Sequence, residues 1–421
     1  MSSLSAVLPH GTFSAIGALS GLVAGAAVIL LLPDVRKLLF VQAMVLIVIG
    51  VVLMLLAGQG GDSISWLDSL SRNTTLLSMV VAVGLLRLVM LDFIDPKSRL
   101  PVGKQAYAKT LLAVTLFGSI INISGPIVIA DRLTANKKLN LFTSSGISRT
   151  FCACSAWSPF FGGMAVVLLY TETADLPSLM MHGLPFTLIS LFVVYWAGVT
   201  RHANEVESFQ GYPLGLQSLA APVVLSLIVL FAYWQFPRLS ILVVITASSI
   251  VLPLAYLLSR EGLSAMIGKF RHHIDTEFCQ SQNELLLFVA AGILASGLSN
   301  YLTGVDIRLP VQSFGATEAA VLLAGMIVVA AMGIHPVIQI AVLTPLLQPL
   351  SPPVNLLAMV YLFSWALGTC GSPLSGTHLV VQGRYGIPAW QAAVRNWPYV
   401  AVMYWVAVII LFWVSLSSTS L

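Results

Sequence analysis

Asn122-Ile-Ser-Gly-Pro126 and, further along, Trp157-Ser-Pro-Phe-Phe-Gly-Gly163 place helix-breaking residues inside long apolar runs. The second half of the chain repeats this arrangement with Gly333-Ile-His-Pro336 and Gly371-Ser-Pro-Leu-Ser-Gly-Thr377. A broken helix at membrane depth is tolerated only where protein or a water-filled cavity satisfies the freed backbone groups. Paired breaks of this kind are typical of midplane binding sites. These four stretches therefore decide the fold that we predict.

The composition indicates a polytopic membrane protein. Of 421 residues, 58% are hydrophobic and only 9% are charged, and several apolar runs exceed the roughly 18 residues that suffice to span a bilayer. The formal net charge is +4 without a basic run, which argues against a nucleic-acid partner. The four cysteines form no secreted-domain pattern, so no disulfide framework is expected. The apolar stretch 13–32 is expected to be a retained helix and not a signal peptide.

Apolar runs separated by charged loops predict where the chain crosses the membrane. Uninterrupted spans are expected at 13–32, 38–57, 74–93, 183–199, 218–236, 239–258, 284–300 and 398–417. The loop 94–109 carries Lys97, Arg99, Lys104 and Lys109, and such basic loops face the cytoplasm. Both termini are then expected outside, in a bacterial-type inner membrane.

The four broken stretches predict two hairpins and two broken helices. Basic residues flank 110–134 on both sides, so this stretch is expected to enter and leave on one face as a re-entrant hairpin. A single kinked span is the alternative. A second hairpin is expected at 314–350. The runs 139–171 and 353–383 are too long for one unbroken span and are interpreted as broken helices.

Proline positions indicate that the two halves are repeats. Three pairs are separated by nearly the same number of residues: Pro126 and Pro336 by 210, Pro159 and Pro373 by 214, and Pro185 and Pro398 by 213. The charge-derived topology gives the halves opposite orientations, as in inverted repeats. We therefore predict an all-α polytopic membrane protein built from repeats 13–210 and 211–417. It would contain about ten transmembrane helices, two of them broken, and two re-entrant hairpins.

This plan resembles the ion transporter superfamily over nearly the whole chain, from about residue 13 to 417. The superfamily includes divalent-anion/sodium symporters, arsenite-type pumps and the membrane subunit of tripartite dicarboxylate transporters. The symporters carry Ser-Asn-Thr at both hairpin tips, whereas the tips here contain Asn122-Ile-Ser124-Gly-Pro and Met332-Gly-Ile-His335-Pro. Their di- or tricarboxylate specificity is therefore not carried over. The resemblance implies a scaffold domain that dimerises and a mobile transport domain that moves like an elevator.

Helix ends at the breaks supply the expected binding chemistry. Ser158-Pro159 and Ser372-Pro373 are predicted to begin helices, with serine as N-cap and proline at the first helical position. Converging helix N-termini offer free N–H donors and partial positive charge to an anion. Carbonyls that precede the breaks suit a small cation such as Na⁺. The breaks hold no carboxylate between residues 150 and 165 or between 366 and 380, which disfavours a cation/proton exchanger.

The candidate residues all lie at the tips and the breaks. The candidates for binding substrate are Asn122, Ser124, Gly125, Ser158, Pro159, His335, Ser372, Pro373, Ser375 and Thr377. The candidates for binding a cation are Ser155, Thr369 and Asn122. For the hydroxyls the alternative is that they only cap helices, and for His335 that it is a packing residue. No metal ligand set or other cofactor is expected.

Four further polar or thiol residues leave alternatives open. His378 is a weaker candidate for ligand or proton binding than His335. Asp131 lies beside Arg132 and is interpreted as part of an interfacial ion pair. Arg149 either snorkels or pairs with a substrate carboxylate. Cys370 precedes the second break and either lines the site or fills space.

The sequence thus predicts a secondary active transporter, and not an enzyme, for a small carboxylate-like anion that is coupled to Na⁺ or H⁺. The expected partners are the lipid bilayer and a second copy of the chain in a homodimer. The alternatives are the membrane subunit of a multi-component transport system, or a cation/proton exchanger. No Walker-type Gly-x-x-x-x-Gly-Lys-Ser/Thr motif occurs, so an ATPase would be a separate chain.

Overall fold

The computed structural model describes residues 25–26, 29–30, 32–58, 73–90, 100–134, 138–214, 216–236, 239–277, 282–305 and 311–418. Within these residues the chain is helical, and the only extended pairing is an isolated bridge between Val102 and Gln210. Six helices in the described part are long and apolar enough to cross a membrane: Lys37–Gly58, Leu176–Arg201, Ile241–Glu261, Gln282–Thr303, Val354–Tyr385 and Ala389–Ser417. The all-helical membrane class is therefore confirmed.

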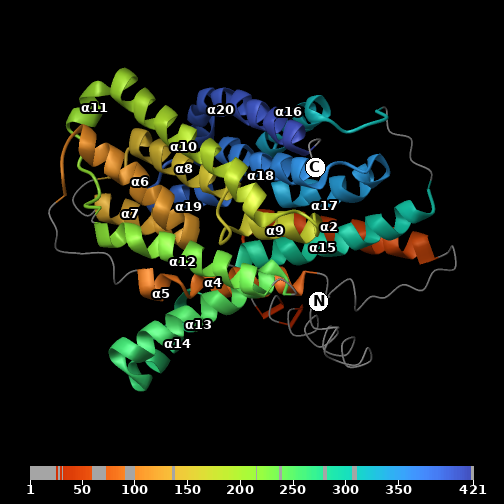
Figure 1. Cartoon of the computed structure of the whole chain (residues 1–421), viewed down its shortest axis with the longest axis horizontal. Helices are drawn as coiled ribbons and strands as arrows, with labels where there is room; N and C mark the ends of the chain where they lie inside the picture. The colour runs from red at the N-terminus through yellow and green to blue at the C-terminus, as the bar shows by residue number, and fades with distance from the viewer. Residues whose placement is uncertain are drawn as a thin grey trace. The chain divides into compact units, whose positions relative to one another are not determined.

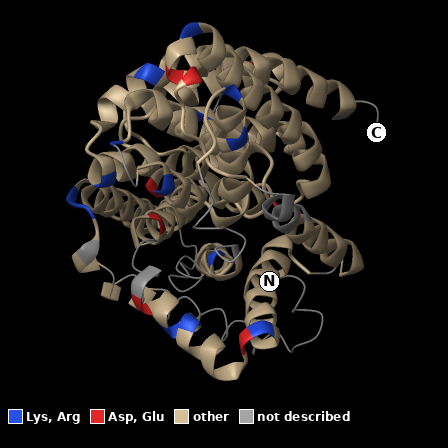
Figure 2. Ribbon diagram, turned by 90° about the vertical axis from the view of Figure 1, so that its left-hand side faces the viewer, with Lys and Arg blue, Asp and Glu red and all other residues tan. Residues whose placement is uncertain are grey.

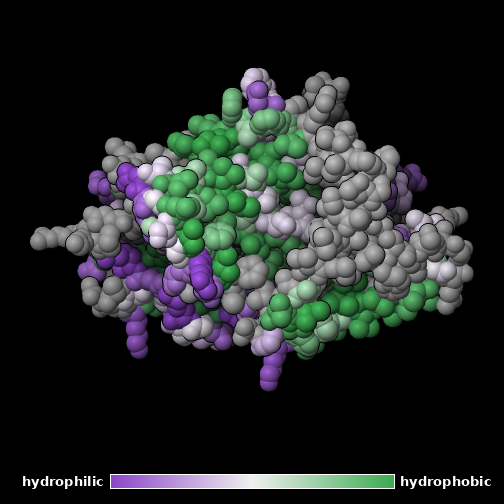
Figure 3. All heavy atoms as spheres, turned by 90° about the horizontal axis from the view of Figure 1, so that it is seen from below, coloured by the Kyte–Doolittle hydropathy of each residue, from purple (hydrophilic) through white to green (hydrophobic). Residues whose placement is uncertain are grey.

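The surface of the described residues agrees with this class. Charged residues are few along the ribbon (Figure 2), and hydrophobic side chains cover wide areas (Figure 3). Large apolar side chains such as Ile409 and Leu416 remain 70% and 71% exposed. Exposed apolar side chains in such number favour lipid as the surrounding medium over water.

The helices form two compact units, and each unit draws on both halves of the chain. The first unit comprises residues 1–89, 228–312 and 337–351, and the second comprises 90–227, 313–336 and 352–421. The boundary at 210/211 between the predicted repeats is therefore not a boundary between compact units. Both predicted broken helices lie in the second unit.

In the first unit, two long apolar helices cross at close range. Its helices are α2 (Lys37–Gly58), α4 (Thr74–Gly84), α5 (Arg87–Met90), the end of α12 (Leu216–Gln235), α13 (Ile241–Glu261), α14 (Leu263–Glu277), α15 (Gln282–Thr303) and most of α17 (Pro336–Leu347). A Cβ at Gly297 would overlap the carbonyl oxygen of Gly50, so only glycine lets α2 and α15 approach this closely. The Asn73 amide donates to the Phe288 carbonyl at 2.6 Å and ties the start of α4 to α15.

The second unit is packed around α18. Its helices are α6 (Lys104–Ile121), α7 (Ser124–Thr134), α8 (Leu141–Ala153), α9 (Gly162–Tyr170), α10 (Leu176–Arg201), α11 (Ala203–Glu207), the start of α12 (Leu216–Gln235), α16 (Ala316–Ala331), α18 (Val354–Gly371), α19 (Gly376–Tyr385) and α20 (Ala389–Ser418). Every residue of α18 from Leu356 to Gly371 is buried. Its neighbours include α8, α9, α10, α16 and α20, and Figure 1 shows several of them around it.

The first predicted hairpin is present in the second unit. Its arms α6 and α7 are joined by Asn122 and Ile123 and pack against each other (Figure 1). A Cβ at Gly125 would lie 2.7 Å from the backbone of Phe117, which shows that the chain folds straight back. The alternative of a single kinked span is therefore wrong. That the hairpin is re-entrant in a membrane stays a prediction.

Other predicted elements agree with the structure less completely. The run 314–350 is divided into α16 and α17, but α17 belongs to the first unit beyond its first residue, Pro336. The predicted span 74–93 contains the short helices α4 and α5, separated by a turn at Leu85 and Leu86. The predicted span 13–32 falls almost wholly outside the described residues. Ten spans and the opposite orientation of the halves stay predictions.

The order of helices repeats along the chain at a nearly constant interval. Starting residues recur 212 positions apart for α6 and α16 and for α7 and α17, 214 apart for α9 and α19, and 213 apart for α10 and α20. This interval agrees with the spacing of the proline pairs. The order of helices from α6 to α10 is therefore repeated from α16 to α20, whereas an inverted repeat of the whole halves stays a prediction.

Candidate functional site

The two breaks meet inside the second unit. The helix α18 packs against the end of α8 and against the turn Cys154–Ala156 that follows it, and the side chain of Cys152 interacts there with Cys370, Thr369 and Thr377. Cys152 and Cys370 are free thiols and both are buried. This position agrees with the expectation that Cys370 lines the site where the breaks come together. The thiol of Cys152 lies beside Cys370 at the same place.

The first break is a stretch of irregular backbone between α8 and α9. A short 3-10 turn, Cys154–Ala156, follows α8, and α9 begins only at Gly162 with Phe161 as its N-cap. The prediction that Ser158 caps this helix with Pro159 at its first position is therefore wrong. The Ser158 hydroxyl instead donates to the carbonyl of Ser119 in α6 and accepts from the amide of Phe160. Ser158 thus fastens the first break to the first hairpin.

The helix that follows the second break, α19, has a different N-cap serine from the one predicted. Ser372 ends α18, and α19 begins at Gly376 with Ser375 as its N-cap, whose hydroxyl accepts from the amide of His378 at 3.4 Å. Ser372 and Pro373 are therefore not the start of a helix. The Ser372 hydroxyl accepts from the Leu374 amide at 3.3 Å, which stabilises the turn between the helices.

The tip of the first hairpin presents uncommitted polar groups. Asn122 has a φ of 51°, a backbone conformation that asparagine adopts more readily than most residues. The side chains of Asn122 and Ser124 are partly exposed and make no hydrogen bond to another described residue. Gly125 has no room for a side chain against α6. Of the candidate residues, Asn122 and Ser124 are therefore the most available to a ligand.

The tip before α17 contacts the second broken helix, and Trp365 of that helix in turn packs against α9 of the first. The His335 ring meets the Trp365 indole of α18 edge-on, with centroids 5.0 Å apart. A Cβ at Gly163 in α9 would lie 2.9 Å from the same Trp365 ring. Gly333 has a φ of +100°, and a Cβ on it would lie 2.5 Å from the Leu374 side chain at the second break. Both tips and both breaks therefore gather in one unit.

Several hydroxyl groups near the breaks donate to backbone carbonyls. Ser155 donates to the Cys152 carbonyl at 2.8 Å, and Thr369 donates to the Trp365 carbonyl at 2.7 Å. Thr187 of α10 donates to the Ala153 carbonyl at 2.7 Å. Ser155 and Thr369 thus have the structural role that was the alternative to cation binding, although their oxygen lone pairs remain. The described residues contain no group of three or more His, Cys, Asp or Glu that could hold a metal ion.

A buried polar network lies behind the second break. The Nδ1 atom of His378 lies 2.8 Å from the Ser372 carbonyl oxygen and so donates to it. Its Nε2 atom then accepts from the Asn396 amide at 3.2 Å, and the Asn396 oxygen accepts from Nε of Arg149 at 2.8 Å. Asn396 and His378 are fully buried. Asn396 was missed because a single polar residue ahead of an apolar span carries no local pattern.

Arg149 is anchored inside the second unit and does not extend freely toward solvent. Its Nη2 donates to the Arg395 carbonyl at 2.6 Å, and its guanidinium lies 5.5 Å from the Tyr399 ring centroid. Within the described residues no carboxylate forms an ion pair with it. Pairing with a ligand's carboxylate therefore stays a prediction.

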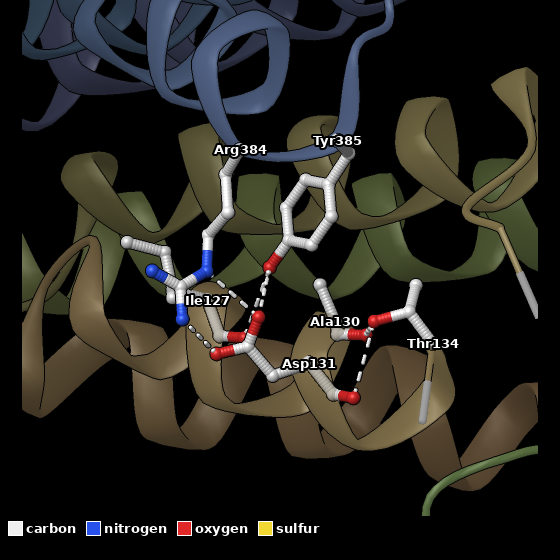
Figure 4. A network of polar contacts seen from close by, with 6 residues as sticks. All are labelled: Ile127, Ala130, Asp131, Thr134, Arg384 and Tyr385. Carbon is white, nitrogen blue, oxygen red and sulfur yellow. Dashed lines mark hydrogen bonds and ion pairs between the residues drawn. The ribbon is translucent and has the colours of Figure 1, made fainter. Parts of the chain in front are cut away.

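Asp131 joins the first hairpin to the second broken helix (Figure 4). Arg384 of α19 donates to its two carboxylate oxygens from Nε at 2.8 Å and from Nη2 at 2.7 Å. The Tyr385 hydroxyl donates to the same carboxylate at 2.8 Å. The sequence predicted an ion pair of Asp131 beside Arg132. The observed partner is Arg384, and the ion pair therefore links two segments that are far apart in the sequence.

No protein-family model and no curated protein matches this chain. The resemblance to the ion transporter superfamily rests on the order of helix breaks, prolines and basic loops.

Proposed function

We propose that this protein is a secondary active transporter of a small, carboxylate-like anion, coupled to Na⁺ or H⁺. The observation that carries the proposal is the gathering of both hairpin tips and both helix breaks in the second unit, with Asn122 and Ser124 left without partners among the described residues. Interrupted helices that converge on uncommitted polar groups are the usual substrate site of secondary transporters.

The charge preference follows from the helix ends. The helices α7, α9, α17 and α19 begin at Ser124, Gly162, Pro336 and Gly376, all beside a tip or a break. Helix N-termini favour anions, and no carboxylate in either break would repel one. A cation/proton exchanger would instead need a buried carboxylate at this place. The geometry therefore favours an anion as the transported solute.

The arrangement of the units supports an elevator-type mechanism. The first hairpin, both broken helices and the first arm of the second hairpin share one unit with α10 and α20, and the long uninterrupted helices α2, α13 and α15 belong to the other. In the mechanism we propose, the second unit carries the solute across the membrane against a first unit that serves as scaffold and dimerises in the bacterial inner membrane.

Transport by purified protein in proteoliposomes tests the proposal. We expect gradient-dependent uptake of at least one anion from a panel of carboxylates and inorganic anions under imposed Na⁺ or pH gradients. Asn122→Asp is nearly isosteric with the native residue but adds negative charge at the tip, so it is expected to reduce anion uptake at least tenfold. Ser259→Ala removes a hydroxyl that bonds only within α13 and serves as the matched control.

Two results would contradict the proposal. The first is the absence of any gradient-driven anion flux by folded protein. The second is normal anion flux in Asn122→Asp together with normal flux in Ser124→Ala, which would place the solute away from the first tip. Flux that appears only after a second protein is added would instead support the membrane subunit of a multi-component system.

A further inference from the structure

A cavity of about 640 Å³ opens in the second unit between α8, α10 and α20. It is separate from the tips, because neither Asn122 nor Ser124 nor any residue of the two irregular breaks lines it. The arginines Arg149, Arg201 and Arg395 line it, together with His202 and several aromatic side chains. No Asp or Glu is among the described residues that line it. The cavity is therefore basic.

The positive charge of this cavity is held in place but hardly neutralised. Arg149 gives its hydrogen bonds to the neutral oxygens of Asn396 and Arg395. Arg395 donates to Nε2 of His202 at 3.2 Å, and Nδ1 of His202 lies 3.3 Å from the Glu205 carboxylate. In the part of the chain that the structure describes, Glu205 is thus the one carboxylate in contact with this group. Three arginines against one carboxylate leave a net positive charge.

Two polar groups at the cavity have no partner within the described part of the chain. Arg201, the last residue of α10, makes no hydrogen bond or ion pair there. Ser145 of α8 is 2% exposed, and its hydroxyl is buried without a hydrogen bond. Buried polar groups are normally satisfied, so the unpaired hydroxyl of the buried Ser145 points to a polar ligand in this cavity, which the exposed side chain of Arg201 also lines.

The rim of the cavity is apolar and exposed. Phe192 and Trp196 of α10 are 60% and 59% exposed, and Val402 of α20 is 49% exposed. Exposed aromatic residues next to arginines at a helix end are typical of the membrane interface, where rings lie at the level of the lipid headgroups. A soluble anion would gain nothing from this rim, whereas acyl chains would pack on it.

We propose that this cavity binds the headgroup of an anionic phospholipid. The phosphate lies among Arg149, Arg201 and Arg395, and the acyl chains lie along Phe192 and Trp196. Basic pockets between membrane helices bind anionic headgroups in this way, and guanidinium groups suit phosphate because they donate two parallel hydrogen bonds. The proposal does not depend on which solute, if any, the protein transports.

Native mass spectrometry of the purified full-length chain tests this assignment with three probes: phosphatidylglycerol, phosphatidylcholine and inorganic phosphate. We expect phosphatidylglycerol to bind more tightly than phosphatidylcholine, whose phosphate is balanced by choline. Arg201→Gln removes one charge without removing a contact within the described chain, and it is expected to weaken phosphatidylglycerol binding about fivefold. Arg260→Gln, at the end of α13 outside the cavity, is the control and is expected to bind as the wild type does.

Three outcomes would overturn the proposal. Equal binding of phosphatidylglycerol and phosphatidylcholine would remove the role of charge. Unchanged binding in Arg201→Gln would place the lipid elsewhere. Inorganic phosphate that displaces phosphatidylglycerol completely at equal concentration would show a site for soluble anions. Because the readout is lipid binding and not flux, a failure here leaves the transport proposal standing, and the reverse also holds.

Discussion

The contact of Asp131 with Arg384 offers the most direct test of how the first hairpin is held to the second broken helix. The perturbation is a double-mutant cycle with Asp131→Ala, Arg384→Ala and the double variant. A cycle isolates the energy of the pair, because effects that each substitution has on its own cancel. If the contact forms as described, the two substitutions are not additive.

The expected magnitude follows from geometry and exposure. The pair is bidentate, with distances of 2.8 and 2.7 Å, but its side chains are 38% and 54% exposed. Exposed ion pairs contribute about 0.2–1 kcal/mol, and the two-pronged geometry places this pair near the upper limit, at about 1 kcal/mol. Asp131→Ala also removes the acceptor of the Tyr385 hydroxyl, so the single variant is expected to lose about 2 kcal/mol in all.

The assay is reversible unfolding of the purified protein in mixed micelles of mild detergent and dodecyl sulfate. Tyr385→Phe is the matched control, since it removes one hydrogen bond and leaves the ion pair intact. Raising the salt concentration should reduce the coupling energy, because the pair is partly exposed. A coupling energy near zero at low salt, with all four proteins folded, would refute the contact between α7 and α19.

Three further predictions concern close packing and the first break, each measured by the same unfolding assay. Gly183→Ala would place a Cβ against the Ala156 carbonyl oxygen of the first break and is expected to lower the free energy of unfolding by about 3 kcal/mol. Gly325→Ala is the control, because its Cβ would point into open space and should leave the stability unchanged or raise it. Equal effects of the two substitutions would contradict the packing of α10. Gly297→Ala is expected to separate α2 from α15 and to lower the free energy of unfolding by about 2 kcal/mol. Gly268→Ala, where a Cβ would meet nothing, is its control. A loss of stability no larger than that of the control would argue against the close contact of α2 and α15. Thr187→Val leaves a break carbonyl without its donor and is expected to cost about 1 kcal/mol; unchanged stability would show that another donor replaces it.

The sequence predicted features that depend on local chemistry. Pro126 and the basic residues on both sides of it were enough to predict the first hairpin, because a helix cannot continue normally through proline and because basic residues stay on one face of the membrane. The interval between Pro185 and Pro398 matches the interval between the starts of α10 and α20. The all-helical class followed from composition alone.

Features that depend on distant contacts could not be predicted in the same way. Ser158 was expected to cap a helix, yet its hydroxyl bonds to Ser119, 39 residues away. Asp131 was assigned to an ion pair beside Arg132, yet its partner Arg384 is 253 residues away. At the second break, two serines compete for one cap, and Ser375 takes it because its hydroxyl reaches the His378 amide. Local spacing does not indicate which of these outcomes has the lower free energy.

The complete burial of α18 has a consequence for the synthesis of this protein. The helices α8, α9 and α10 are made long before α18, and yet α18 fills the space between them. When only the first half of the chain has been synthesised, α8, α9 and α10 are present but the helix on which they pack, α18, is not. We therefore expect the early helices to pack incompletely until α18 has been synthesised. Truncation ahead of α18 would leave a partial assembly and not a smaller working domain.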